Sequence, residues 1–165
     1  MEFILGKVTN EDLDAILELG ASVNEEHVVP LLNAEGQQAI RIAFKSDIDK
    51  VKDPDIYSVI KASVGHDIVG YIGWREENYL GHLYVKTDYH GFGVAKQLVE
   101  AMTKMSGAKL IRVKASIYAL GFYQKVGFKA TSEELSINSI RYVPMELKVE
   151  HAPYKKTMTL QELAD

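Results

Sequence analysis

Two glycines near the middle of the chain stand where a strand-like segment gives way to a helical one. Gly91 and Gly93 follow the apolar segment 79–85 and precede the segment 94–105, where apolar residues recur at helical spacing. A helix start leaves about four N–H groups without partners and carries the positive end of the helix dipole, so it attracts phosphate. Glycine has no Cβ atom, so a diphosphate can approach its backbone closely. The spacing predicts a diphosphate-binding loop, and the alternative is a turn that only connects two elements.

Two common nucleotide-binding motifs are excluded at this loop. The dinucleotide fingerprint needs a third glycine where Lys96 stands, and the P-loop needs a Gly-Lys-Ser/Thr sequence that is absent. A diphosphate at this loop would therefore belong to another class of ligand.

A second motif lies downstream, at residues 116–128, where the sequence reads SIYALGFYQKVGF. Together the two motifs resemble the acetyl-CoA signature of the GCN5-related N-acetyltransferase (GNAT) superfamily. Its loop pattern is Gln/Arg-x-x-Gly-x-Gly/Ala, and the loop here reads HGFGVA at residues 90–95. Its helix pattern is Asn-x-x-Ala-x-x-Phe-Tyr-x-x-x-Gly-Phe, which this chain matches at Ala119, Phe122, Tyr123, Gly127 and Phe128. The resemblance is specific over residues 68–128.

The resemblance implies that acetyl-CoA binds as the acyl donor. Main-chain N–H groups of the strand before the loop would stabilise the oxyanion, and the loop would hold the diphosphate. The implied cofactor-binding residues are Leu83, Tyr84, Val85, His90, Gly91, Phe92, Gly93, Val94, Ala95, Lys96, Ser116, Ala119 and Phe122. His90 replaces the usual Gln or Arg, and Ser116 replaces the usual Asn with a shorter side chain. Neither change prevents phosphate binding by the main chain.

Acetyl transfer to an amine also requires proton transfers. A primary alkyl amine with a pKa near 10 is neutral in about one molecule per thousand at pH 7, so its proton must be removed. The departing thiolate needs a proton, and the resemblance assigns Tyr123 as the general acid. An ordinary tyrosine pKa near 10 keeps this hydroxyl protonated at neutral pH. The alternative is a tyrosine packed at a helix end, with its hydroxyl hydrogen-bonded inside the protein.

His82 is the candidate general base. A pKa near 6.5 lets a histidine accept a proton at neutral pH, and His82 lies on the strand before the loop. Tyr79 and Glu77 are alternatives, acting directly or through water. Alternation places Leu83 and Val85 on the opposite face from His82 unless a bulge turns the strand. The structural alternative for His82 is a half-buried side chain with satisfied hydrogen bonds.

The resemblance therefore implies an N-acetyltransferase in which a primary amine, of a small molecule or a peptide, attacks acetyl-CoA directly in a ternary complex. A covalent route is not indicated, because the chain has no cysteine and no serine in a nucleophile elbow. One alternative is a domain that binds acetyl-CoA or CoA without turnover, as a sensor or scaffold. A third is a generic α/β interaction module. Glu25, Glu26 and His27 are candidates to contact the amine, or they belong to a solvated loop.

A small mixed sheet must position these residues. Strand patterns cover residues 2–8, 56–64, 68–74, 79–85, 110–113, 128–132 and 137–147. Helical patterns cover residues 10–23, 30–44, 94–105 and 117–126. The second of these helices is opened by Pro30, and the charged segment 47–55 is predicted to be a surface connection. We predict an α/β (α+β) GNAT-like fold: a mixed, mostly antiparallel central sheet of six to seven strands, with two parallel central strands and about four flanking helices.

The composition is that of an ordinary globular domain, with 165 residues, 47% hydrophobic and 25% charged. We expect one domain at residues 1–148 and a tail at 149–165 that is a lid, a dimerisation arm or a loosely ordered terminus. The chain has no cysteine, and no metal site is expected. A net charge of −4 argues against nucleic acid as a partner, although lysines near the glycine loop suit a polyanion.

Neither a signal-peptide pattern nor an apolar run of about 18 residues is visible in the sequence. We therefore expect a cytoplasmic protein that does not span a membrane, as a monomer or a homodimer.

Overall fold

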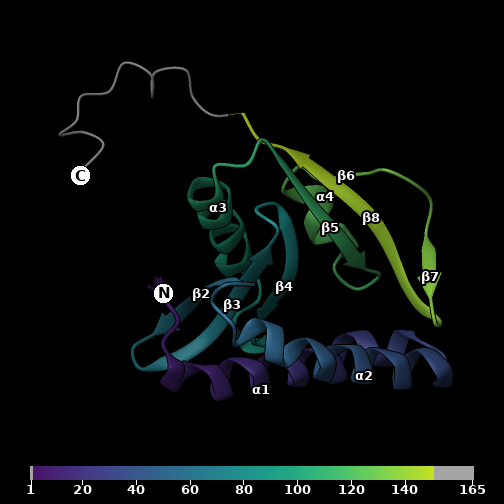
Figure 1. The fold of residues 1–165 in the computed structure, drawn as a ribbon, viewed down its shortest axis with the longest axis horizontal. Helices are drawn as coiled ribbons and strands as arrows, with labels where there is room; N and C mark the ends of the chain where they lie inside the picture. The colour runs from purple at the N-terminus through teal and green to yellow at the C-terminus, as the bar shows by residue number, and fades with distance from the viewer. Residues whose placement is uncertain (1, 151–165) are drawn as a thin grey trace.

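The computed structural model describes residues 2–150, which form one sheet with helices on both faces (Figure 1). Its strands are β1 (Ile4–Lys7), β2 (Ser58–Val64), β3 (Asp67–Arg75), β4 (Tyr79–Val85), β5 (Leu110–Ser116), β6 (Lys129–Ala130), β7 (Leu135–Ile137) and β8 (Ile140–Lys148). Their order is β1-β2-β3-β4-β5-β8-β6, and β7 pairs with β8. Every pairing is antiparallel except that of β4 with β5. The predicted mixed sheet is confirmed, and the three-residue β7 is an additional strand.

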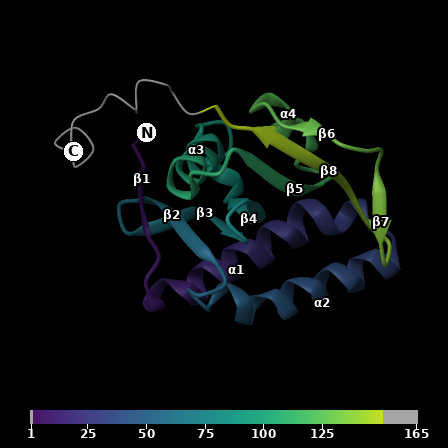
Figure 2. The same ribbon diagram turned by 45° about the horizontal axis from the view of Figure 1, so that its top comes forward.

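The α-helices of the described chain are α1 (Leu13–Val23), α2 (Ala34–Val51), α3 (Val94–Ser106) and α4 (Leu120–Lys125). Helices α1 and α2 lie together under one face of the sheet, and α3 lies on the other face (Figure 2). Leu98 and Met102 of α3 belong to a buried cluster with Ile72 of β3. Ile16 of α1 belongs to a second buried cluster with Tyr71 of β3. The central strands are therefore held between two apolar layers.

The second helix begins and ends at different residues from those predicted. Pro30 lies in a short 3-10 turn, and α2 starts only after Asn33, whose side chain accepts a hydrogen bond from the Gly36 amide at 2.8 Å. The helix then continues to Val51, so the prediction of a connection from residue 47 was wrong. Phe44, Ile48 and Val51 recur at helical spacing and are partly or fully buried, which holds this charged segment helical.

Strand β4 carries a bulge at Gly81 and diverges from β5. His82 pairs with Gly73 of β3 and Leu80 pairs with Trp74, so Gly81 is an extra residue in β4. A Cβ atom at Gly81 would collide with the hydroxyl of Tyr57, so glycine is needed there. The parallel pairing with β5 covers only two residues of β4, Tyr79 and Leu80. Beyond Leu80 the two strands separate, next to the bulge.

Residues 151–165 of the predicted tail lie outside the described residues. At its start, the Val149 amide donates a hydrogen bond to the Lys109 carbonyl at 2.8 Å. None of the helices between residues 2 and 150 has the length and apolar character that crossing a membrane requires. Within the same residues, no group of three or more His, Asp or Glu side chains is placed to hold a metal ion.

Candidate active site

A cavity of about 460 Å³ lies beside the glycine loop, where β4 and β5 separate. Every predicted cofactor-binding residue lines it except Phe92 and Ser116. Phe92 is 55% exposed at the outside of the loop, and Ser116 lines a neighbouring cavity instead. The other predicted residues therefore form the cavity wall without Phe92 or Ser116.

The glycine loop presents open backbone to this cavity. Gly91 and Gly93 have positive φ angles of 85° and 81°, a left-handed conformation that glycine adopts without strain. A Cβ atom built on either residue would meet nothing within 4 Å. Helix α3 follows directly, and no side chain caps its first turn. Its first N–H groups therefore lack partners at the cavity wall, as an anion site requires.

The charges around this cavity have one sign. Lys96 and Lys125 line it, and no Asp or Glu does so within residues 2–150. The ring of His90 fastens the loop to β4, because its Nε2–H donates to the Val85 carbonyl at 2.7 Å. Two of the lysines near the glycine loop, Lys96 and Lys125, therefore do line the cavity. The cavity is suited to a polyanion such as a diphosphate.

Residues after α1 contact Thr87, just before the glycine loop, and Tyr118. The ring of His27 stacks on Tyr118 with centroids 4.5 Å apart, and its Nε2 lies 2.8 Å from the Thr87 hydroxyl. The Thr87 hydroxyl donates to Glu26 at 3.0 Å. Glu26 and His27 thus join the segment after α1 to Thr87, just before the glycine loop. Sequence reasoning had no signal for these contacts, because Thr87 lies far from both residues along the chain. Contact of Glu26 or His27 with an amine stays a prediction.

A second cavity of about 400 Å³ adjoins the first. Both cavities are lined by Leu83, Tyr84, Ala119 and Tyr123, so they meet at these residues. The second cavity extends toward α2 and the hairpin of β7 and β8, away from the glycine loop. Ligands entering from the two sides would therefore approach each other beside Tyr123.

Tyr123 combines a buried ring with an unpaired hydroxyl. The residue is 5% exposed, and its ring packs against Phe122 and Phe128. In the part of the chain that the structure describes, its hydroxyl makes no hydrogen bond, so the alternative of an internally bonded tyrosine does not hold. Burial first, and then the nearby Tyr84 and Tyr79, raise the pKa of this hydroxyl well above its ordinary value. Tyr123 therefore presents a protonated hydroxyl where the cavities meet.

His82 lies on the opposite side of β4, toward the helical layer. It is 2% exposed, with Nε2 2.6 Å from Asp47 Oδ2 and Nδ1 2.9 Å from the Tyr71 hydroxyl. Both ring nitrogens are engaged, and His82 lines neither of the two cavities. The bulge at Gly81 does not turn the ring toward Leu83. The base role of His82 thus stays a prediction that this geometry does not support.

Asp47 is a residue that sequence reasoning missed. Its carboxylate accepts hydrogen bonds from His82 at 2.6 Å and from the Tyr57 hydroxyl at 2.9 Å. Burial acts to raise the pKa of Asp47, but the hydrogen bonds from these two residues outweigh it, so the pKa is lowered. No local signal marked Asp47, because its partners come from the sheet.

Of the other base candidates, Tyr79 lines the second cavity and Glu77 does not. Burial raises the pKa of Tyr79, which keeps its hydroxyl protonated at neutral pH. Nearby, Tyr84 accepts a hydrogen bond from the buried Asn24 side chain at 3.2 Å, and burial raises the pKa of Tyr84 to about 12. Among the described residues that line it, the second cavity thus offers tyrosine hydroxyls but no carboxylate or histidine that could act as a base at neutral pH.

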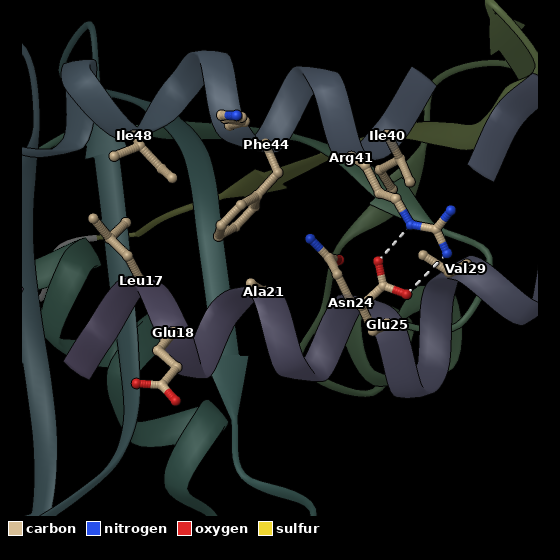
Figure 3. Close-up of a pocket in the computed structure, with 11 residues that line it drawn as sticks. Leu17, Glu18, Ala21, Asn24, Glu25, Val29, Ile40, Arg41, Phe44 and Ile48 are labelled. Carbon is tan, nitrogen blue, oxygen red and sulfur yellow. Dashed lines mark hydrogen bonds and ion pairs between the residues drawn. The ribbon is translucent and has the colours of Figure 1, made fainter. Parts of the chain in front are cut away.

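A third cavity, of about 340 Å³, lies between α1 and α2 (Figure 3). Leu17, Phe44 and Ile48 project into it, and Arg41 donates two hydrogen bonds to Glu25 at one end, at 2.6 and 3.0 Å. Tyr123 and the glycine loop do not line this groove. We therefore do not assign it to acetyl transfer.

Comparison with known proteins agrees with this arrangement. A family described as the acetyltransferase (GNAT) domain matches residues 33–149. A Bacillus subtilis (strain 168) protein named "putative acetyltransferase" is 31% identical over 81 residues, which cover 47% of this chain and 52% of that protein. The chain thus matches about half the length of this curated relative.

Solved structures share the fold at low sequence identity. A GCN5-related N-acetyltransferase from Rhodopseudomonas palustris is 22% identical with a TM-score of 0.71, over 90% of this chain and 97% of that one. The PaiA N-acetyltransferase of Thermoplasma acidophilum, solved with coenzyme A, is 21% identical with a TM-score of 0.70, over 90% of this chain and 100% of that one. The family match spans most of the chain and includes the glycine loop and Tyr123, so this chain belongs to the acetyltransferase (GNAT) domain family.

Proposed function

We propose that this protein is an N-acetyltransferase that transfers the acetyl group of acetyl-CoA to a primary amine by direct attack in a ternary complex. The observation that carries the proposal is the meeting of two cavities at the unpaired hydroxyl of Tyr123. The cavity with the glycine loop takes the cofactor, because it joins open backbone amides to a basic wall. The other cavity takes the amine. The coenzyme A bound to the Thermoplasma protein supports this choice of cofactor.

The splayed part of β4 supplies the oxyanion site in this proposal. In an antiparallel pair, successive N–H groups point alternately toward and away from the partner strand. Beyond Leu80, the amides of β4 that point away from β3 face the gap beside β5, where no ladder continues. Such amides can donate to the oxygen of a tetrahedral intermediate, an interaction worth about 3–4 kcal/mol in known oxyanion holes.

The proton balance of the reaction needs only the amine and Tyr123. The neutral amine attacks the thioester carbon, the new C–N bond forms, and the C–S bond breaks. Tyr123 gives its proton to the departing thiolate, and the proton lost by the amine nitrogen returns to Tyr123 through water. The second cavity has no carboxylate within residues 2–150 to hold an ammonium ion, which favours entry of the neutral amine.

Ligand-induced stabilisation tests cofactor binding. A ligand at a hundred times its Kd adds about 2.7 kcal/mol of stability, which raises Tm by roughly 5–10 °C for a chain of this size. We expect this shift with acetyl-CoA and CoA and none with NAD or ATP. No shift with the CoA compounds would refute the proposed cofactor site.

Release of free CoA thiol in the presence of amines tests turnover. Thiol release that depends on an added amine, with N-acetyl product found by mass spectrometry, supports the transferase. The alternative is a CoA-binding domain without catalysis, which is consistent with the lack of a carboxylate or histidine among the described residues that line the second cavity. Stabilisation by acetyl-CoA without thiol release for any primary amine would select that alternative.

A further inference from the structure

The second cavity has a distinctive charge pattern. Among the described residues that line it, the charged ones are Lys114 and Arg141, and none is acidic. Its remaining wall is mainly aliphatic and aromatic, including Ile40, Tyr79 and Tyr142. A site of this kind has no group to pair with a second ammonium charge. A polycationic acceptor would therefore be repelled by the lysine and the arginine.

Arg141 is already neutralised by a neighbour. Its Nε and Nη2 each donate to a carboxylate oxygen of Glu134 at 2.9 Å. Its Nη1 also donates to the Leu31 carbonyl at 3.3 Å. These contacts use three of the five N–H groups of the guanidinium, two of them in a bidentate pair with the carboxylate. The charge of Arg141 is therefore already paired with a carboxylate, whereas that of Lys114 is not.

Lys114 is the cation that remains available. It is exposed on β5, and in residues 2–150 no carboxylate forms an ion pair with its Nζ. Its Nζ lies 5.5 Å from the ring centroid of Tyr142, on the neighbouring strand β8. The Tyr142 ring thus holds a positive charge at the cavity wall without neutralising it.

The size of the cavity limits the ligand. A volume of about 400 Å³ lies in the range of small-molecule sites. The aliphatic and aromatic wall favours an apolar body, and the free ammonium group of Lys114 favours a negative charge on that body. An amine nitrogen must still reach Tyr123, where this cavity meets the cofactor cavity.

We propose that the acceptor is a small amino acid-like molecule: a primary amine on an apolar or aromatic body that also carries a carboxylate, which Lys114 binds. This inference rests on the proposed acetyl transfer and specifies its substrate class. It excludes polyamines and other polycations as preferred acceptors.

Matched pairs of acceptors test the inference with the full chain and acetyl-CoA. The pairs are phenylalanine with 2-phenylethylamine, and 4-(aminomethyl)benzoate with 4-methylbenzylamine; spermidine represents the polycations. We expect kcat/KM to be at least about tenfold higher for the carboxylate member of one pair, equivalent to about 1.4 kcal/mol. Equal rates within both pairs, or a preference for spermidine, would overturn the inference.

Variants of Lys114 locate the effect. Lys114→Gln should remove most of the tenfold preference by lowering kcat/KM for the carboxylate members, and Lys114→Glu should invert the preference. Lys104→Gln, an exposed lysine in the last turn of α3, is the matched control and should keep the preference. If Lys114→Gln lowers kcat/KM equally for both acceptors of a pair, Lys114 does not bind the carboxylate. The stabilisation by acetyl-CoA should be the same in all variants, which shows that they fold.

Calorimetry tests the proposed acceptor site independently of the proposed acetyl transfer. With CoA present, 4-(aminomethyl)benzoate should bind to the wild type and at least about tenfold more weakly to Lys114→Gln. This result supports the site even if no thiol is released, in which case only the transferase proposal fails. Absence of binding to the wild type, with acetyl-CoA still stabilising the chain, overturns the inference alone.

Discussion

At the scale of single residues, Tyr123 shows how burial can serve proton transfer. A phenol in contact with water has a pKa near 10, whereas burial raises the pKa of Tyr123 further. The proton therefore stays on the hydroxyl over the whole neutral and moderately basic range. Because the hydroxyl has no partner among the described residues, it is free to donate to a ligand that reaches the junction of the cavities.

Tyr123→Phe should lower kcat by about a hundredfold or more, the usual contribution of a positioned general acid. The ring stays in place, so Tm and the Kd for acetyl-CoA should change little. Because the pKa is raised, wild-type kcat should show no falling limb up to about pH 10. The general-acid role would be wrong if the variant acetylated amines at the wild-type rate. A falling limb below pH 10 that Tyr123→Phe abolished would instead contradict the raised pKa of this hydroxyl.

At the scale of elements, the two ends of α3 use the same backbone conformation for different purposes. Gly93 before the helix and Gly107 after it both have positive φ, at 81° and 64°, and both have open space around a built Cβ. Gly107 ends the helix in the manner of a left-handed C-cap. Only Gly93 lines the cofactor cavity. Alanine at either position would strain the backbone, but only alanine at Gly93 would also disturb ligand binding.

Gly93→Ala and Gly107→Ala should each lower the free energy of unfolding by about 1 kcal/mol, the cost of a left-handed alanine. Gly93→Ala alone should raise the Kd for acetyl-CoA, by about tenfold or more, because one charge-assisted hydrogen bond to the diphosphate is worth about 1.5–3 kcal/mol. Urea unfolding and calorimetry measure the two quantities. Equal effects of both variants on the Kd would show that the loop does not hold the cofactor.

At the scale of the whole molecule, a polar network joins the helical layer to the sheet. Asp47 of α2 contacts His82 of β4 and Tyr57 just before β2, and His82 contacts Tyr71 of β3. The pKa of Asp47 is lowered in the folded state, so its ionised form stabilises the fold. This stabilisation is complete above the unfolded value of 3.8 and is lost as pH falls through the lower, folded pKa.

Asp47→Asn should therefore lower the free energy of unfolding by about 1–3 kcal/mol at pH 7, because it weakens two hydrogen bonds to a partly buried charge. The difference from the wild type should shrink as pH falls below 3.8, where the unfolded state begins to bind the proton. Asp49→Asn, an exposed change on the same helix, should stay within about 0.5 kcal/mol of the wild type. The network is not the cause if the two variants lose equal stability, or if the loss at pH 3 equals that at pH 7.

Local features were predictable from the sequence alone. The bounds of β4 and the glycine loop followed from segments whose neighbours in the chain determine their backbone. The start of α2 was misplaced at Pro30 because both Pro30 and Asn33 can open a helix, and the side chain of Asn33 caps it in the folded protein. Its end was misplaced because a charged run also suits an amphipathic helix once one face has something to pack against.

The sequence by itself determined the family resemblance, the glycine loop and the placement of Tyr123 in a helix beside it, because these depend on residues close together in the chain. Only the tertiary structure decided which way side chains face. The distant carboxylate of Asp47 holds the His82 ring away from the cavities, and the pairing of β5 with β8 brings Lys114 to Tyr142. Such contacts join residues tens of positions apart, and a local pattern carries no information about them.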